Sequence, residues 1–210
     1  MEAGTRTAHW AGVYAGRDED RLTWFEARPA PSLTLIKRHA PPPASVIDIG
    51  AGASRLVDAL LERGYADITL LDLSEAALAA SRERLGADAA RVTWQVADIT
   101  LWTPERRFDL WHDRAVFHFL TEEAERAAYI RALDAALAPG GHAVIATFAP
   151  DGPETCSGLP VRRYAPTTLA DEIGRHTSGS FALIDSLDHM HRTPIGRTQS
   201  FQYSVLERRD

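Results

Sequence analysis

The sequence has very little cysteine and no long apolar runs, and each shortage excludes a class of protein. Cys156 is the single cysteine among 210 residues, so the chain cannot form an internal disulfide or a multi-cysteine metal cage. No run approaches the ~18 apolar residues that a membrane-spanning helix needs. The N-terminal residues also lack a basic segment followed by an apolar one, so we expect no secretory signal and a cytoplasmic location.

Basic residues are also fewer than acidic ones. The chain has 23 Lys and Arg residues against 29 Asp and Glu, a net charge of −6 with both signs interspersed. This balance disfavours polyanionic partners, so we expect a small-molecule substrate and neither nucleic-acid nor membrane partners. Apolar residues make up 45% and charged residues 25%, which is typical of a globular protein, and the length suits one domain. The oligomeric state stays open.

A stiff proline segment at residues 41–43 separates an N-terminal segment, 1–39, from a core at 44–210. In the core, short apolar runs alternate with amphipathic stretches. This alternation predicts an α/β fold with a mostly parallel sheet and helices on both faces. The expected strands cover 46–49, 68–72, 92–96, 108–111, 142–148, 181–189 and 199–206. The expected helices cover 54–63, 74–86, 121–138 and 167–175, with the end of a further short helix at 32–38.

A glycine-rich turn follows the first expected strand, where ligands of such sheets bind. Gly50 and Gly52 would let the backbone approach a ligand closely. Asp48 would repel a pyrophosphate, and the spacing differs from G-x-G-x-x-G, so the turn favours a ligand with an ammonium group over a dinucleotide. Without a ligand, the same turn would only connect a strand to a helix.

Acidic residues also end the next two strands. Asp72 can accept hydrogen bonds from ribose hydroxyls, or it can help to start the helix after Ser74. Asp98, followed by Ile99, can accept from an exocyclic adenine amine, or it can be an ordinary turn residue. Three acidic residues at three successive strand ends favour a nucleoside ligand over three unrelated turns.

These motifs resemble those of the class I S-adenosylmethionine-dependent methyltransferases. The matching segments are Val46–Ser54, Leu70–Ser74, Ala97–Ile99 and Leu137–Gly141. The resemblance implies a Rossmann-like seven-stranded sheet in the order 3-2-1-4-5-7-6, with the last strand antiparallel. It also implies S-adenosyl-L-methionine as the cofactor. The chain departs from the pattern at Ser54, where many members carry a third glycine.

By the same resemblance, the cofactor site is spread over the strand ends. The glycine loop would hold the methionine part, Asp72 the ribose, and Asp98 with Ile99 the adenine. The residues expected to bind the cofactor are Tyr14, Trp24, Asp48, Gly50, Gly52, Ser54, Asp72, Leu73, Asp98, Ile99 and His112.

The segment after the fourth strand is expected to reach the mouth of the site. Its Asp-Arg-Ala unit at 113–115 resembles the Asp-Arg-Gly of thiopurine-type methyltransferases and the Asp-Lys-Gly of some protein-lysine methyltransferases. An imidazole here is a possible proton acceptor. Each residue also has a simpler alternative role. His112 can be a shelf under the cofactor, Asp113 and Arg114 can form a local ion pair, and His118 can be a packed core histidine. The candidate catalytic residues are His112, Arg114 and His118.

Two further segments, 153–164 and 189–199, complete the predicted acceptor pocket. The first is a long loop, which is either part of the pocket or a surface loop with an incidental thiol. His189 and His191 share a strand face, but no third ligand lies within sequence reach, so we predict no metal site. The candidate substrate residues are Asp113, Cys156, Arg162 and His191.

Aromatic residues gather in the N-terminal segment. Tyr14, Trp24 and Phe25 predict a helical lid, residues 1–39, over the methionine end of the cofactor. The alternative is simple packing of these side chains onto the sheet.

The leading functional hypothesis is a methyltransferase that acts on a small soluble thiol, selenol or amine. The alternative is a protein-lysine methyltransferase, and an open acidic groove in place of a closed pocket would distinguish it. A non-catalytic cofactor-binding protein is disfavoured by the intact motifs. A dinucleotide oxidoreductase is disfavoured by Asp48.

Overall fold

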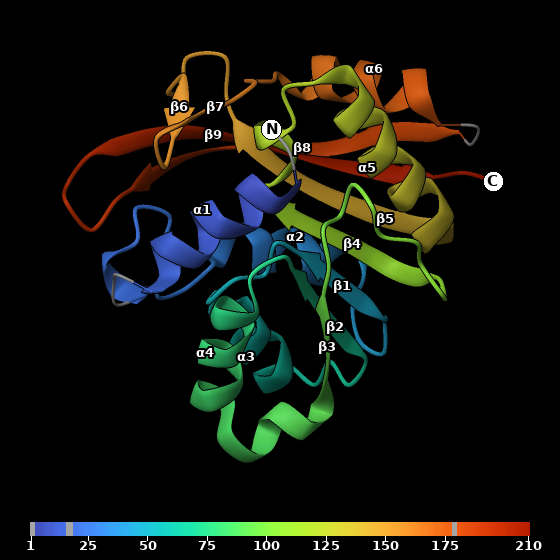
Figure 1. The fold of residues 1–210 in the computed structure, drawn as a ribbon. Helices are drawn as coiled ribbons and strands as arrows, with labels where there is room; N and C mark the ends of the chain where they lie inside the picture. The colour runs from blue at the N-terminus through green and yellow to red at the C-terminus, as the bar shows by residue number, and fades with distance from the viewer. Residues whose placement is uncertain (1–2, 16–18, 178–179) are drawn as a thin grey trace.

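A seven-stranded sheet forms the centre of the computed structural model, which describes residues 3–15, 19–177 and 180–210 (Figure 1). The strand order is β3-β2-β1-β4-β5-β9-β8. Strands β1 to β5 run parallel, and β9 is antiparallel to both of its neighbours. Numbered along the chain within this sheet alone, the order is 3-2-1-4-5-7-6, which confirms the predicted topology.

Helices cover both faces of this sheet, and a small hairpin follows β5 (Figure 1). The strands are β1 Val46–Ile49, β2 Ile68–Asp72, β3 Val92–Val96, β4 Phe108–Arg114, β5 Leu137–Phe148, β6 Thr155–Cys156, β7 Leu159–Pro160, β8 Phe181–Arg192 and β9 Thr198–Arg208. The α-helices are α1 Ala3–Ala15, α2 Ala30–His39, α3 Leu56–Glu62, α4 Glu75–Leu85, α5 Glu123–Ala136 and α6 Pro166–His176. Short 3-10 turns lie at Glu19–Arg21, Gly86–Arg91 and Phe117–Phe119. Within the described residues, no helix combines the length and the apolar character needed to cross a membrane.

Alternate strand residues build a core on each face of the sheet. Val46 and Leu110 pack with α2, α3 and α4 on one face. Ile47 and Trp111 pack with α5 and α6 on the other. The central strands are therefore buried on both sides, which is why they read as nearly continuous apolar runs.

Among the predicted boundaries that differ from the structure, those at β4 and β5 lie nearest the site. β4 continues through His112 and Asp113 to Arg114, because these residues pair with β5 as well as with the strand end of β1. The helix predicted through 138 ends at Ala136, and Leu137 already pairs with Phe108. The Leu-Ala-Pro-Gly-Gly segment therefore opens β5.

The N-terminal segment divides into two parts. Helix α2 buries Leu35 and Ile36 in the core against α3. Helix α1 instead lies over the carboxyl ends of the strands, where Arg6, Trp10 and Tyr14 help to line a cavity. The structure thus gives α2 mainly a packing role and leaves α1 and residues 22–26 to cover the site.

Candidate active site

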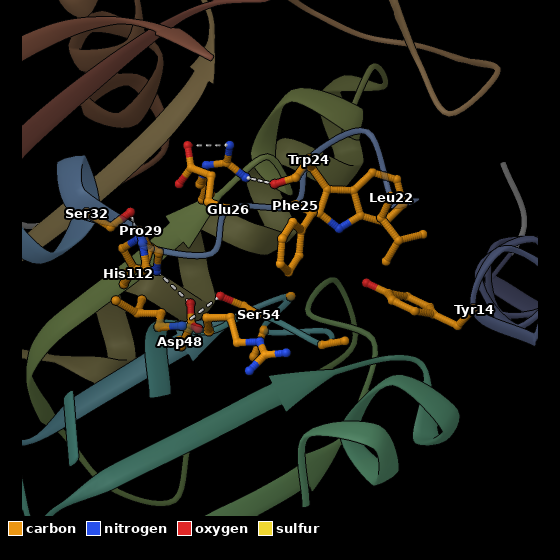
Figure 2. A pocket seen from close by; sticks show the side chains of 16 residues that line it. Tyr14, Leu22, Trp24, Phe25, Glu26, Pro29, Ser32, Asp48, Ser54 and His112 are labelled. Atoms are coloured by element: carbon orange, nitrogen blue, oxygen red, sulfur yellow. Dashed lines mark hydrogen bonds and ion pairs between the residues drawn. The ribbon is translucent and has the colours of Figure 1, made fainter. Parts of the chain in front are cut away.

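Two adjoining cavities lie at the carboxyl ends of β1, β2 and β4. We call them the large and the small cavity, and Tyr14, Trp24, Gly50 and Arg114 line both. The walls of the large cavity include Asp72, Leu73, Asp98, Ile99, Cys156 and Phe201. The walls of the small cavity include Glu26, Ser32, Asp48, Ser54 and His112 (Figure 2). The structure thus gathers most of the predicted cofactor residues around one connected site.

The glycine loop between β1 and α3 has no room for side chains. Gly50 and Gly52 adopt left-handed backbone angles, with φ of 63° and 53°. A Cβ atom on Gly50 would lie 2.1 Å from a methyl carbon of Val116, and one on Gly52 would lie 2.3 Å from the Tyr14 hydroxyl. Both glycines are therefore required by conformation and by close approach.

Asp72 holds this loop from the end of β2. Its carboxylate accepts hydrogen bonds from the amides of Gly52, at 2.9 Å, and Ser74, at 2.7 Å. Burial raises the pKa of Asp72 to about 6, although these two amides favour its charged form. Ser74 itself caps α4, since its hydroxyl accepts from the Ala77 amide. Asp72 therefore helps to start α4, which was one of the two roles expected from the sequence. Its side chain also faces the large cavity, where the other expected role, ribose binding, would take place.

At the other end of the large cavity, Asp98 is bound by α1. One oxygen of Asp98 accepts from the amide and hydroxyl of Thr100, at 2.9 and 2.7 Å. The other oxygen lies 3.0 Å from the Arg6 guanidinium, which also pairs with Glu125 at 2.7 Å. Arg6 was missed from sequence because nothing local marks a helix residue that reaches two distant acidic groups.

A buried hydrogen-bonded chain crosses the small cavity (Figure 2). His112 Nδ1 lies 2.6 Å from Asp48, and His112 Nε2 lies 2.8 Å from the Ser32 hydroxyl. All three side chains are buried. A neutral ring satisfies this chain, with Nδ1 donating to the carboxylate and Nε2 accepting from the hydroxyl. The network locks the imidazole between β1 and α2, and Ser32 is a second residue that sequence reasoning missed.

Arg114, at the end of β4, joins the two cavities. Its guanidinium donates to the Trp24 carbonyl at 2.9 Å and to the Tyr203 hydroxyl at 3.2 Å, and it pairs with Glu26 at 3.1 Å. It also lies 4.9 Å from the centre of the Phe201 ring. Arg114 thus fixes the 24–26 segment at the wall of both cavities.

The comparisons with known proteins agree with this geometry. The family described as methyltransferase domain matches residues 46–141, the part that carries the strand-end motifs. The chain is 34% identical, over 69% of its length, to a trans-aconitate 2-methyltransferase of Methylobacterium radiotolerans. A protein of that same description from Acidovorax ebreus is 34% identical over 78% of the chain.

Residues 46–141 belong to the methyltransferase-domain family, as the strand-end motifs predict. The chain spans about half the length of the Methylobacterium relative, 50%, and 61% of the Acidovorax one. Among solved structures, it resembles the 1,6-didemethyltoxoflavin-N1-methyltransferase of Burkholderia thailandensis, with a TM-score of 0.77 and 25% identity. That match covers 100% of this chain and 92% of that one, whose structure holds S-adenosylhomocysteine and 1,6-didemethyltoxoflavin. The S-adenosylhomocysteine bound in that structure agrees with the cofactor predicted for this chain, S-adenosylmethionine.

Two of the predicted active-site residues lie in the core beside the cavities. Asp113 accepts from the amides of Val116 and Phe117 and from the Tyr129 hydroxyl, so its carboxylate organises the turn after β4. His118 is fully buried, and burial, with the nearby Arg114 charge, lowers its pKa to about 3. The structure therefore favours the packed alternative for His118.

The remaining predicted substrate residues are dispersed. Cys156 lines the large cavity, and burial raises its pKa to about 11, so the thiol is neutral near pH 7. Arg162 turns away to Glu172, at 3.5 Å. His191 lies beside Glu26, at 3.3 Å, behind the wall of the small cavity. Only Cys156 of these three faces the large cavity directly.

Proposed function

We propose that the protein transfers the methyl group of S-adenosylmethionine to a small soluble acceptor whose nucleophile is a thiol, a selenol or an amine. The observation that carries this proposal is the large cavity. It joins strand-end carboxylates to an apolar end that α1 and the 24–26 segment cover. Such a partly covered space, once the cofactor and the acceptor fill it, can exclude water and hold a nucleophile in line with the sulfonium methyl group.

For the cofactor, we propose that Asp72 accepts from the ribose hydroxyls. Asp98, Leu73 and Ile99 surround the adenine, since these three residues line the same end of the large cavity. The methionine part lies along Gly50, which lines both cavities, with Gly52 two residues further along the same loop.

The small cavity continues the methionine site. Asp48, Ser54 and His112 line it, together with Tyr14 and Trp24 from the covering segment. Through its hydrogen bond to His112, Asp48 keeps a carboxylate near the place where the cofactor ammonium would lie.

The acceptor end of the large cavity supplies little proton-transfer chemistry. In the described structure it is lined by Trp10, Arg114, Phe119, Cys156, Gln199 and Phe201. His112 already uses both ring nitrogens, and the lowered pKa of His118 makes that ring a poor base at pH 7. A nucleophile that ionises by itself, or a neutral amine, fits such an end better than an alcohol.

The guanidinium of Arg114 weighs against a protein-lysine substrate. It lines both cavities and is the charged side chain at the acceptor end, where a lysine methyltransferase would need groups that tolerate an ammonium. The cover over the cavity also disfavours a peptide groove.

An acceptor scan tests the proposal. Purified protein is incubated with S-adenosylmethionine and with thiols, selenols, amines and a lysine-containing peptide, and S-adenosylhomocysteine is measured by mass spectrometry. We expect product with at least one small acceptor, reduced tenfold or more in Asp72→Ala. The matched control is Asp88→Ala, whose carboxylate lies on the surface and pairs with Arg91. Product with the peptide alone would contradict the proposal.

A further inference from the structure

A cluster of metal-ligating side chains lies behind the wall of the small cavity. His189 and His191 are two apart on β8, with the exposed Met190 between them pointing the other way. Glu26 reaches them from the segment before α2. One ligand atom from each of the three side chains lies within 4.8 Å of the others. The structure thus supplies the third ligand that the sequence alone did not show.

The hydrogen bond of His191 fixes which nitrogen faces Glu26. Its Nε2 lies 2.8 Å from the Thr23 carbonyl, which can only accept, so Nε2 carries a proton. In a neutral ring, Nδ1 then presents a lone pair to Glu26 Oε1, at 3.3 Å. Two acceptors do not hydrogen-bond, so a cation belongs between them, either a proton or a metal ion. A carbonyl that receives the second N–H of a histidine is the usual support of a metal ligand.

The charged groups around Glu26 contact one of its two carboxylate oxygens and leave the other without a partner among the described residues. Its Oε1 lies 3.1 Å from Arg114 and 3.5 Å from His189 Nε2. Its Oε2 is buried and has no hydrogen-bond partner among the described residues. Arg114 opposes the binding of a further cation at Oε1, while its other two nitrogens donate to the Trp24 carbonyl and the Tyr203 hydroxyl. Oε2 therefore remains as a ligand atom that this arginine does not use.

We propose that Glu26, His189 and His191 bind a first-row divalent cation, with Zn²⁺ as the probe. Two imidazoles and one carboxylate form a donor set that suits such ions and leaves a coordination position open. The ion would tie the 24–26 segment, which lines both cavities, to β8 at the edge of the sheet. The site therefore stabilises the cover of the cavities, and its existence does not depend on the proposed methyl transfer.

Zinc titration of the full chain without an affinity tag tests this site. Calorimetry should show one Zn²⁺ per chain for the parent. His189→Ala and Glu26→Gln should each bind Zn²⁺ at least tenfold more weakly. His189 is partly exposed, so its replacement leaves the core intact, and circular dichroism checks the fold of both variants. The matched control is His176→Ala, a histidine on α6 outside the cluster, which should bind like the parent.

Thermal unfolding gives a second readout that is independent of activity. Saturating Zn²⁺ should raise the melting temperature of the parent and leave that of His189→Ala unchanged, because binding to the folded state alone stabilises it. Absence of zinc binding by the parent would mean that the cluster holds only an imidazolium–carboxylate pair. Equal affinity in the parent and both variants would place the ion elsewhere. Either result overturns the proposal.

Discussion

At the scale of single residues, Asp72 is the group whose protonation should control cofactor binding. Its pKa in the free protein is raised to about 6, mainly by burial. Ribose hydroxyls donate to the ionised carboxylate, so the affinity for S-adenosylhomocysteine should be constant above pH 7. It should fall as the pH drops through 6, approaching tenfold per pH unit. Calorimetry between pH 5 and pH 8 measures this. The variant Asp72→Asn should bind weakly with little pH dependence. A parent affinity that stays flat down to pH 5 would contradict the assignment.

Gly52 offers a second test, and Gly64 is its matched control. Both glycines have a left-handed backbone, but only Gly52 has atoms close to where a Cβ would lie. Gly64→Ala should cost about 1 kcal/mol of unfolding free energy through backbone strain and leave cofactor affinity intact. Gly52→Ala should add a clash with Tyr14 and weaken S-adenosylhomocysteine binding at least tenfold. Equal binding by the two variants would show that the loop does not contact the cofactor. Urea unfolding and calorimetry provide the two measurements.

Single residues also show which positions a local sequence pattern can indicate and which it cannot. Asp48, Asp72 and Asp98 could be predicted because each stands at a strand end, a position that local pattern defines. Arg6 and Ser32 could not, since they meet their partners Asp98 and His112 across 92 and 80 positions of the chain. Only tertiary packing creates such pairs.

At the scale of elements, α1 is the part of the molecule that should respond most to the cofactor. Arg6 ties it to Asp98 and Glu125, beside the proposed adenine position. S-adenosylhomocysteine should increase hydrogen-exchange protection at residues 9–15 and 19–28. Arg6→Ala should lower the protection of α1 in the free protein. Unchanged exchange on ligand binding would leave the aromatic residues of this segment as ordinary packing.

The contact between α5 and α6 includes a buried ion pair beside its apolar residues. Arg126 lies 2.6 Å from Glu172, and both side chains are almost fully buried. Arg126→Ala should cost about 3 kcal/mol of unfolding free energy, because it leaves a buried carboxylate without its main partner. Arg131→Ala removes an exposed arginine of the same helix and should cost less than about 0.5 kcal/mol. Urea unfolding compares them. Similar losses in the two variants would argue against the ion pair.

Element boundaries were predicted less well than element types. The expected fourth strand stopped three residues before its end at Arg114, because polar residues such as His112 and Asp113 do not read as a buried strand. Their partners on neighbouring strands and helices satisfy these side chains, and the sequence does not display those partners.

At the scale of the whole molecule, the alternation of strands and helices was enough to predict a parallel α/β sheet. The strand order came from the family resemblance, and the structure confirms it. The cover of the cavities was harder to predict in detail. Residues 1–39 were expected to act together, yet α2 packs in the core while α1 lies over the strand ends. The division depends on apolar contacts between distant segments.

We expect S-adenosylmethionine to bind at the carboxyl ends of β1, β2 and β3 through Asp72. Titration calorimetry of S-adenosylmethionine into the parent, Asp72→Ala and Asp88→Ala tests it most directly. One cofactor should bind per chain of the parent, and Asp88→Ala should bind it with the same affinity. Binding should be at least tenfold weaker for Asp72→Ala, since each hydrogen bond to a charged group contributes about 1.5–3 kcal/mol. No binding by the parent, or equal affinity in all three proteins, would contradict it.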